Sequence, residues 1–215
     1  NISKLSNIKR VRYTTSHPID FTDDLIKVHS SCHKLMPLIH LPVQSGSNKI
    51  LKSMNRKHTV ENYLELVNKL RKANPLIKFS SDFIIGYPGE TKDDFEKTVS
   101  LMKQVEFINS YSFIFSARPG TPAANLKKVD EKIAKERLLI FQRAANEIKE
   151  KYRKELVNST ASVLFENNTR GSDRYFGRDE YFNSVIVNSD ENLIGKIRNV
   201  KINSCNQNTL FGEVS

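Results

Sequence analysis

Residues 82–91, DFIIGYPGET, combine a carboxylate, an apolar run and a turn within one short segment. The apolar run suits a strand that is buried on both faces, and parallel α/β proteins bind ligands where such strands end. Pro88 and Gly89 fit the second and third positions of a type II turn. Thr91 is the predicted cap of a helix, with Asp94 at the N3 position of a capping box. The segment therefore predicts a strand, a turn and a helix that form one wall of a site.

Polar side chains lie within or directly after several of the predicted strands. A buried carboxylate at Asp82 requires a partner, either a ligand hydroxyl or amine or a neighbouring backbone N–H. Gln44, Ser45 and Gly46 follow another apolar strand, and an amide that donates and accepts suits a zwitterionic or sugar-bearing ligand; an ordinary polar turn has the same composition. Arg118 precedes a stiff Pro and Gly turn, where it either binds a carboxylate or phosphate or lies on a surface loop.

Two further clusters have a functional and a structural interpretation. His29, Cys32 and His33 have helical spacing that suits a metal, but three residues on an outer helix favour a partly buried helix face, so we predict no metal site. Basic residues gather after the second strand, either as a polyanion patch or as a solvated helix face, and their position near the site favours RNA binding. This basic cluster consists of Lys49, Lys52, Arg56, Lys57 and His58.

The elements that must position these groups alternate between strand and helix patterns, as in parallel α/β folds. The predicted strands are residues 10–14, 38–43, 79–85 and 110–115. The predicted helices are residues 23–33, 59–73 and 130–156, besides a short helix after residue 48 and the helix that Thr91 caps. The apolar stripe predicted for the last helix is Ile133, Phe141, Ala145, Ile148, Tyr152 and Leu156. The strand ends would line one rim of a barrel, where barrel enzymes carry their chemistry.

The period changes from helical to alternating beyond residue 157. Residues 161–166, 184–187, 195–202 and 209–214 are predicted strands, separated by Gly and Asn turns. A tail of about 60 residues with this pattern has the size of a small barrel. We therefore expect an α/β domain at residues 1–156, built as part of a TIM-like barrel, and an all-β, OB-like barrel at residues 157–215.

The chain carries a formal charge of +10, and this charge is unevenly distributed. Residues 1–156 hold 28 Lys and Arg against 17 Asp and Glu, whereas residues 157–215 hold 6 against 7. A basic first domain fits a polyanionic partner as well as an ordinary solvated surface. No apolar stretch approaches the roughly 20 residues that cross a bilayer, and two distant cysteines indicate a reducing compartment. We expect a cytoplasmic protein that acts without a membrane.

Three blocks of the sequence resemble the radical S-adenosylmethionine methylthiotransferases. They are residues 40–56 (HLPVQSGSNKILKSMNR), 80–91 (SSDFIIGYPGET) and 110–124 (SYSFIFSARPGTPAA), and residues 10–18 (RVRYTTSHP) agree. The tail, with Gly177, Arg178 and Asn183 in GRDEYFN, resembles the TRAM module with which this family holds RNA. The third block favours the tRNA-modifying branch, because the branch that acts on a ribosomal protein usually has an acidic residue in place of Arg118.

The resemblance implies addition of a methylthio group to C2 of N6-dimethylallyl-adenosine next to the anticodon of tRNA. In this family one [4Fe-4S] cluster reduces S-adenosylmethionine to a deoxyadenosyl radical, and a second [4Fe-4S] cluster delivers the sulfur. For this chain it implies that Gln44 and Ser45 hold the methionine or ribose part of the cofactor and that Asp82 supports it. The backbone near Ile85 and Gly86 is implied to face the adenine.

The same resemblance implies further residue roles, and the sequence departs from the family in its cysteines. Arg118 is implied to orient the methionine carboxylate or the RNA, and Arg178 and Asn183 to contact RNA; no catalytic side chain is predicted. The family needs a CxxxCxxC motif and three more cysteines, whereas this sequence has only Cys32 and Cys205.

The chain begins with Asn1 rather than Met, which we interpret as a piece of a longer protein. We expect a monomeric C-terminal portion that is inactive alone and requires an N-terminal half with the cluster domains and a reductant such as flavodoxin or ferredoxin. The alternatives are a stand-alone RNA-binding module and a methylthiotransferase that acts on a ribosomal protein or on threonylcarbamoyl-adenosine.

Overall fold

The computed structural model describes residues 2–14, 17–169 and 173–215. The chain forms two compact units that divide between Ile148 and Lys149, inside the last helix. The sequence pattern had suggested a domain boundary after residue 156, at the end of that helix. The two units are described separately below.

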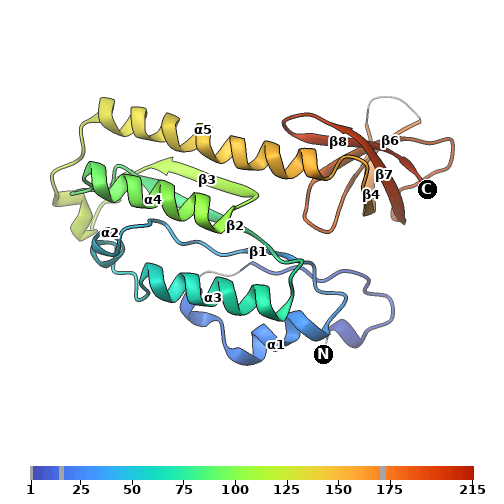
Figure 1. The fold of residues 1–215 in the computed structure, drawn as a ribbon, viewed down its shortest axis with the longest axis horizontal. Helices are drawn as coiled ribbons and strands as arrows, with labels where there is room; N and C mark the ends of the chain where they lie inside the picture. Colours follow the sequence, from blue (N-terminus) through green and yellow to red (C-terminus); the bar gives the residue numbers. More distant parts are fainter. Residues whose placement is uncertain (1, 15–16, 170–172) are drawn as a thin grey trace. The chain divides into compact units, whose positions relative to one another are not determined.

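The first unit is a three-stranded parallel sheet with the order β1-β2-β3 (Figure 1). Its strands are β1 (Leu38–His40), β2 (Lys78–Ile85) and β3 (Asn109–Ile114). The helices are α1 (Asp23–Ser31), α2 (Asn48–Ser53), α3 (Val60–Ala73), α4 (Lys92–Val105) and α5 (Glu131–Glu155), with short 3-10 helices at Ile2–Lys4, Pro18–Asp20 and Pro122–Asn125. Helical crossovers between parallel strands confirm the predicted β/α architecture.

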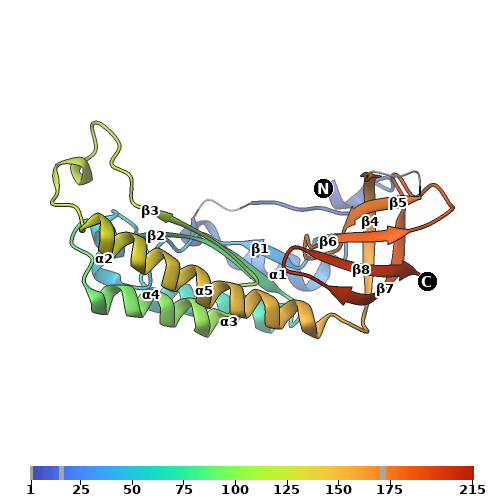
Figure 2. The ribbon, with the colours of Figure 1, turned by 90° about the horizontal axis from the view of Figure 1, so that it is seen from above.

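Helices α3, α4 and α5 cover one face of this sheet (Figure 2). Alternate residues of β2, namely Phe79, Phe83 and Ile85, are fully buried against them in one hydrophobic core. The core draws on an apolar stripe from each helix, as the 3.6-residue period predicts. The stripes contribute Tyr63, Leu66, Val67 and Leu70 from α3, Phe95, Leu101, Met102 and Val105 from α4, and Phe141 and Ala144 from α5. One face of the sheet is therefore committed to packing, which leaves the other for a site.

The predicted start of α4 is confirmed in detail. The Thr91 hydroxyl accepts a hydrogen bond from the Asp94 backbone N–H, and the Asp94 carboxylate accepts one from the Thr91 backbone N–H, which is a complete capping box. Gly89, at the predicted third position of the turn, has φ +81°, a backbone conformation that favours glycine. The segment after β2 is thus fixed by its own local chemistry.

Three sequence predictions in this unit need correction. Residues 10–14 are not a strand, because Val11 and Thr14 form only isolated bridges to Leu35 and His40. The strand predicted at residues 38–43 ends at His40, shortly before a proline that has no N–H to donate to a ladder. Ile133 does not belong to the buried stripe of α5: its side chain is exposed, and the next residue, an alanine, is buried instead.

The second unit is a closed five-stranded barrel with the order β4-β5-β6-β8-β7. Its strands are β4 (Thr160–Asn168), β5 (Arg174–Arg178), β6 (Ser184–Asn188), β7 (Ile197–Cys205) and β8 (Thr209–Val214). Inward residues such as Val163, Tyr175, Val185 and Leu210 fill the barrel. The predicted small barrel is confirmed, but β5 was missed. Its central Gly177 weakens the strand pattern, although a Cβ there would lie only 2.5 Å from the Leu164 carbonyl oxygen.

Candidate functional site

A cavity of about 700 Å³ lies in the first unit, beside the carboxyl ends of β2 and β3. Its polar lining includes Gln44, Arg56, Asp82 and Arg118, and a further amide comes from Asn55. Apolar and aromatic walls come from Ile84, Tyr87, Phe113 and Phe115. The sequence had singled out the four polar residues separately, and the fold brings them to one cavity. Strand ends of parallel α/β folds are the usual place for such a site.

The alternation of β2 decides which of its side chains reach the cavity. Asp82 and Ile84 lie on the face opposite the packed core, because successive side chains of a strand point to opposite faces. In the parallel register, Asp82 is paired with Tyr111 and Ile84 with Phe113. Tyr111 and Phe113 are 51% and 59% exposed, respectively. This face of the sheet is therefore open and partly aromatic.

Asp82 lies inside β2 rather than at its head, and its side chain is 32% exposed, so the predicted buried carboxylate is corrected. Its Oδ2 lies 3.4 Å from Nε2 of His40, whose Nδ1 lies 3.0 Å from the hydroxyl oxygen of Ser80. Burial lowers the pKa of Arg56, and the charge of Asp82 raises it. A partly exposed carboxylate thus lies beside an imidazole, in a cavity that a guanidinium also lines.

Gln44 continues the pairing of β1 after a local distortion. Its backbone N–H donates to the Asp82 carbonyl at 3.0 Å, and its carbonyl accepts from the Ile84 N–H at 3.0 Å. Its φ is +74°, a conformation that costs a non-glycine residue of the order of 1 kcal/mol. Backbone strain of this kind concentrates at functional sites, and here it directs an amide into the cavity.

Three other predicted site residues do not line this cavity. Ser45 is buried, and its hydroxyl lies 3.3 Å from that of Thr98 on α4. Ile85 is fully buried in the core on the opposite face of the sheet. The Gly86 N–H donates to Glu90 at 3.1 Å, so it is already occupied. Strand alternation and the packing of the turn on α4 explain why neighbours of cavity residues point away.

Several cavity residues were not singled out from the sequence. The ring of Tyr87 packs edge-on against Phe115 with centroids 4.9 Å apart, and its hydroxyl donates to the Ser53 carbonyl at 2.9 Å. His40 contacts Asp82, but it lies four residues before the polar turn that begins at Gln44 and was not predicted as a site residue. The signal for Tyr87 was its place beside the Pro and Gly turn, and that for His40 was its two-residue spacing before a proline. Neither signal distinguishes a site residue from a packing residue.

Both units of the chain match known proteins. A profile of the radical SAM superfamily matches residues 1–102, and a profile of the TRAM domain matches residues 154–215. The tRNA-2-methylthio-N(6)-dimethylallyladenosine synthase of Pelagibacter ubique is 55% identical over 214 residues, and that of Rickettsia canadensis is 47% identical over 215. These alignments cover 100% and 99% of this chain and 48% of each relative. The chain therefore combines a radical SAM domain with a TRAM domain and is homologous to these synthases over about half of their length.

The chain spans about half the length of the curated relatives that it matches. A solved radical SAM enzyme, the coproporphyrinogen III oxidase of Escherichia coli, has a similar fold with a TM-score of 0.53. That similarity covers 80% of this chain and 46% of the oxidase at 15% sequence identity, so it supports the fold alone. The parallel β/α unit and the β-barrel thus correspond to the radical SAM and TRAM matches within this chain.

The radical SAM family uses iron–sulfur clusters, and the described residues do not fit one. They contain no group of three or more Cys, His, Asp or Glu side chains that could hold a metal. Cys32 is the C-cap of α1, Cys205 ends β7, and both are free. His29, which the sequence placed near Cys32 as a candidate ligand, lies 2.5 Å through its Nε2 from the Tyr13 hydroxyl.

The residues assigned to RNA from the sequence have different environments. Lys52 and Lys57 are exposed, and the Lys57 ammonium donates to Asn55. Arg56 lines the cavity instead of the outer surface. Asn183 is 4% exposed, and its amide donates to the buried Asp179 at 2.8 Å. A buried amide that closes a turn is not available to RNA, so the assignment of Asn183 is corrected.

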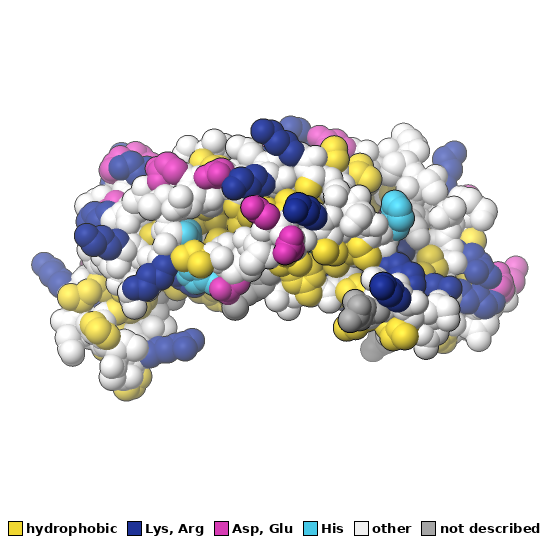
Figure 3. Space-filling model, turned by 90° about the horizontal axis from the view of Figure 1, so that it is seen from below, with side chains coloured by type: hydrophobic (Ala, Val, Ile, Leu, Met, Phe, Trp, Pro, Cys, Tyr) yellow, Lys and Arg dark blue, Asp and Glu magenta, His cyan; other side chains and the backbone are white. Residues whose placement is uncertain are grey.

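The positive charge is not concentrated in one continuous patch on the visible face. Figure 3 shows Lys and Arg side chains dispersed among hydrophobic and acidic ones.

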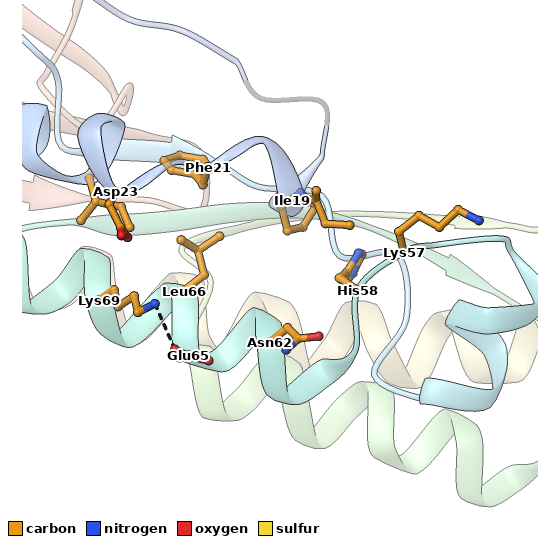
Figure 4. Close-up of a pocket in the computed structure, with 11 residues that line it drawn as sticks. Ile19, Phe21, Asp23, Lys57, His58, Asn62, Glu65, Leu66 and Lys69 are labelled. Atoms are coloured by element: carbon orange, nitrogen blue, oxygen red, sulfur yellow. Dashed lines mark ion pairs between the residues drawn. The ribbon is translucent and has the colours of Figure 1, made fainter.

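A second, smaller cavity of about 230 Å³ lies between the Pro18–Asp20 turn and α3 (Figure 4). His58, from the basic cluster, is 4% exposed beside it. Neither ring nitrogen has a hydrogen-bond partner within the described residues. Burial, then the charges of His17 and Arg56, lowers the pKa of His58 to about 4. His58 is therefore a neutral, buried imidazole at neutral pH and not a phosphate-binding cation.

None of the helices that the structure describes has the length and apolar character needed to span a bilayer.

Proposed function

We propose that this chain carries the S-adenosylmethionine pocket and the RNA-binding module of a tRNA methylthiotransferase whose cluster ligands lie outside residues 1–215. The substrate proposed is a tRNA with N6-dimethylallyl-adenosine, the nucleoside in the name of relatives that align with the whole chain. The observation that supports the pocket is the convergence of Gln44, Asp82 and Arg118 on one cavity. The partners proposed are tRNA, the cluster-bearing part of the enzyme and a reductant.

The polar groups of the cavity match the charges of the cofactor. Asp82 accepts hydrogen bonds and suits the ammonium of the methionine moiety, whereas Arg118 suits its carboxylate. Gln44 both donates and accepts, which suits ribose hydroxyls. When bound, S-adenosylmethionine supplies a methyl group and radical chemistry. The side chains of this chain bind it and orient it.

The apolar walls supply the remaining recognition. Ile84 and Phe113 lie side by side on β2 and β3, and Tyr87 and Phe115 pack against each other. Flat apolar surfaces of this kind suit an adenine ring and exclude water from its faces. Arg56 lines the same cavity, and the charge of Asp82 raises its pKa against the effect of burial, so the two side chains attract each other.

Binding of S-adenosylmethionine to the 215-residue chain tests the proposed pocket. Titration followed by amide ¹H–¹⁵N chemical shifts detects weak binding, and we expect the largest shifts near Gln44, Asp82 and Tyr87. Asp82→Asn should weaken binding about 10-fold or more, because it removes one charge-assisted hydrogen bond. The matched control is Asp93→Asn, which removes an exposed carboxylate on α4 that pairs with Lys97. Equal affinities of both variants would refute the assignment of Asp82.

The proposed RNA substrate is tested in cells. Deletion of the gene should abolish the methylthio group of the modified adenosine, as measured by mass spectrometry of digested tRNA. Retention of that group would instead favour a protein substrate.

The second candidate is an RNA-binding module without cofactor chemistry. It is favoured by one observation, the lack of a group of metal-ligating side chains among the described residues. The two candidates differ in the cavity: binding of S-adenosylmethionine supports the first, and RNA binding without it supports the second.

A further inference from the structure

An outward-facing apolar row crosses three neighbouring strands of the barrel. In the register of the sheet, Phe176 of β5 lies beside Ile186 of β6, which lies beside Phe211 of β8. The adjacent residues Tyr175 and Leu210 point inward and are buried in the barrel core. Strand alternation therefore directs the row outward, and its three side chains are only half-buried. The two rings are separated by two interstrand spacings, or about 10 Å.

Arginines flank this row on both sides. Arg174 lies two residues before Phe176 on β5, and together with Ile186 and Phe211 it lines a groove of about 200 Å³. On the other side, the guanidinium carbon of Arg178 lies 5.2 Å from the centroid of the Phe176 ring. The face thus presents aromatic surfaces with a cation on either side of Phe176 on β5, a combination with which proteins hold single-stranded nucleic acids.

The β5–β6 turn extends the same face. Phe182 is 47% exposed and has φ +65°, a conformation unusual for a bulky residue. The buried carboxylate of Asp179 maintains this turn by accepting from the N–H groups of Tyr181 and Asn183 at 2.9 and 2.7 Å. The guanidinium carbon of Arg178 lies 4.1 Å from the Phe182 ring centroid. An exposed ring held in a strained conformation by a buried network indicates a functional surface.

Carboxylates near the row limit its charge without removing it. Glu166 lies 3.8 Å from Nε of Arg178, and Glu213 on β8 is paired in register with Lys201. The Arg178 guanidinium also donates to the Phe182 carbonyl, so it is positioned before any ligand binds. The balance favours a ligand that offers both apolar faces and phosphates over one that offers charge alone.

We propose that the outer face of β5, β6 and β8 is a stacking platform for unpaired nucleobases of RNA, with Phe176 and Phe211 beneath the bases and Arg174 and Arg178 at their phosphates. The proposal rests on the RNA-binding role proposed above and names the surface that performs it. It replaces the buried Asn183 with half-buried, outward-facing rings as the main contacts. Because every base has an apolar face, the platform distinguishes unpaired from paired RNA more than it distinguishes sequences.

The test is binding of the 215-residue chain to a fluorescein-labelled anticodon stem-loop RNA, measured by fluorescence anisotropy, with a fully paired duplex of equal length as the comparison. Phe211→Leu retains apolar volume but removes the ring, and it should weaken stem-loop binding about 5-fold or more while duplex binding changes little. Arg174→Gln should weaken binding to both RNAs and reduce its salt dependence.

Matched variants control for loss of folding and of general charge. Ile194→Ala removes an exposed apolar side chain of the same barrel outside the row, and Arg198→Gln removes an arginine that pairs with Glu191. Neither should change the preference for unpaired RNA. A 2-aminopurine base in the loop should lose fluorescence on binding to the wild type, because stacking quenches it, and should lose less on binding to Phe211→Leu.

The outcomes separate this proposal from the proposed function. If the stem-loop binds and Phe211→Leu binds it equally well, the platform is wrong and the RNA-binding role remains. If the wild type binds neither RNA, both fail. If Phe211→Leu instead converts a dimer to a monomer without changing RNA affinity, the face is a self-association surface and the platform is wrong.

Discussion

The ion pair between Glu90 and Arg137 fastens α5 to the turn that follows β2. Nη1 of Arg137 lies 2.8 Å from Oε1 of Glu90, and the two side chains are 12% and 1% exposed. The same carboxylate oxygen accepts from the Gly86 N–H, and the other oxygen has no partner within the described residues. We predict that Arg137→Met strongly destabilises the first unit, because it leaves a buried carboxylate without its counter-charge.

The magnitude follows from the burial of the pair. Removal of one partner from a buried ion pair costs about 3 kcal/mol or more, since the remaining charge is neither solvated nor neutralised. Burial raises the pKa of Glu90, whereas the hydrogen bond and charge of Arg137 lower it. In Arg137→Met the pKa of Glu90 therefore rises further. A carboxyl group with a raised pKa in the folded state favours folding at low pH, and this contribution is lost as the pH rises through that pKa.

Urea denaturation at pH 8 and pH 5 measures both effects. Circular dichroism at 222 nm follows mainly the first unit, because the second is a β-barrel apart from the end of α5. We expect the free-energy cost of Arg137→Met to be smaller at pH 5 than at pH 8. The double variant Glu90→Gln/Arg137→Met should be more stable at pH 8 than Arg137→Met alone, because no uncompensated charge remains.

Lys135→Met is the matched control on the same helix. Its ion pair with Glu131 is exposed to solvent, so the substitution should leave stability nearly unchanged at both pH values. Our reasoning is refuted if Arg137→Met costs no more than Lys135→Met, or if its cost does not depend on pH.

Three further perturbations test other parts of the first unit. Gly46→Ala should lower the free energy of unfolding in urea by about 2 kcal/mol, since a Cβ would lie 2.4 Å from the Lys97 carbonyl oxygen. Gly89→Ala has open space around it and should lower that free energy by only about 1 kcal/mol, because alanine disfavours the positive φ at this position. Burial opposes ionisation of Asp94, but hydrogen bonds from Lys49, Ser47 and Thr91 hold its pKa well below the usual range. The ionised Asp94 carboxylate therefore stabilises the fold above about pH 4, and this contribution is lost as the pH falls further. The urea midpoint of Asp94→Asn should depend less on pH below 4 than that of the wild type. Burial lowers the pKa of His58 to about 4, so its neutral ring contributes to the free energy of unfolding above about pH 6.5, and this contribution is lost as the pH falls. In urea, His58→Phe should therefore lose less stability than the wild type between pH 7 and pH 5.

Local signals in the sequence were sufficient wherever neighbouring residues determine the outcome. The capping box of Thr91 and Asp94 and the turn at Gly89 are short-range hydrogen bonds and backbone preferences, and the structure confirms them. The apolar stripes of α3 and α4 follow from the helical period. The missing cluster cysteines required only a count of residue types.

The sequence was less informative where a strand pattern is weak or where two helix faces compete. The strand β5 contains Gly177 and ends in arginine, so its pattern is not apolar enough to stand out. Ile133 and its buried neighbour Ala134 differ by one position, or about 100° around α5, and only the partner surface decides between them.

Family resemblance and residue types thus determined from the sequence that this chain combines a radical SAM β/α unit with a TRAM barrel and that polar groups gather near its strand ends. Only the tertiary structure decided which of them share a cavity. Gln44 and Ser45 are adjacent, yet the first reaches the cavity and the second packs on α4. Asp82 and Ile85 likewise point to opposite faces of one strand. The physical reason is that a side chain's direction depends on strand register and on contacts with distant helices, which no local pattern specifies.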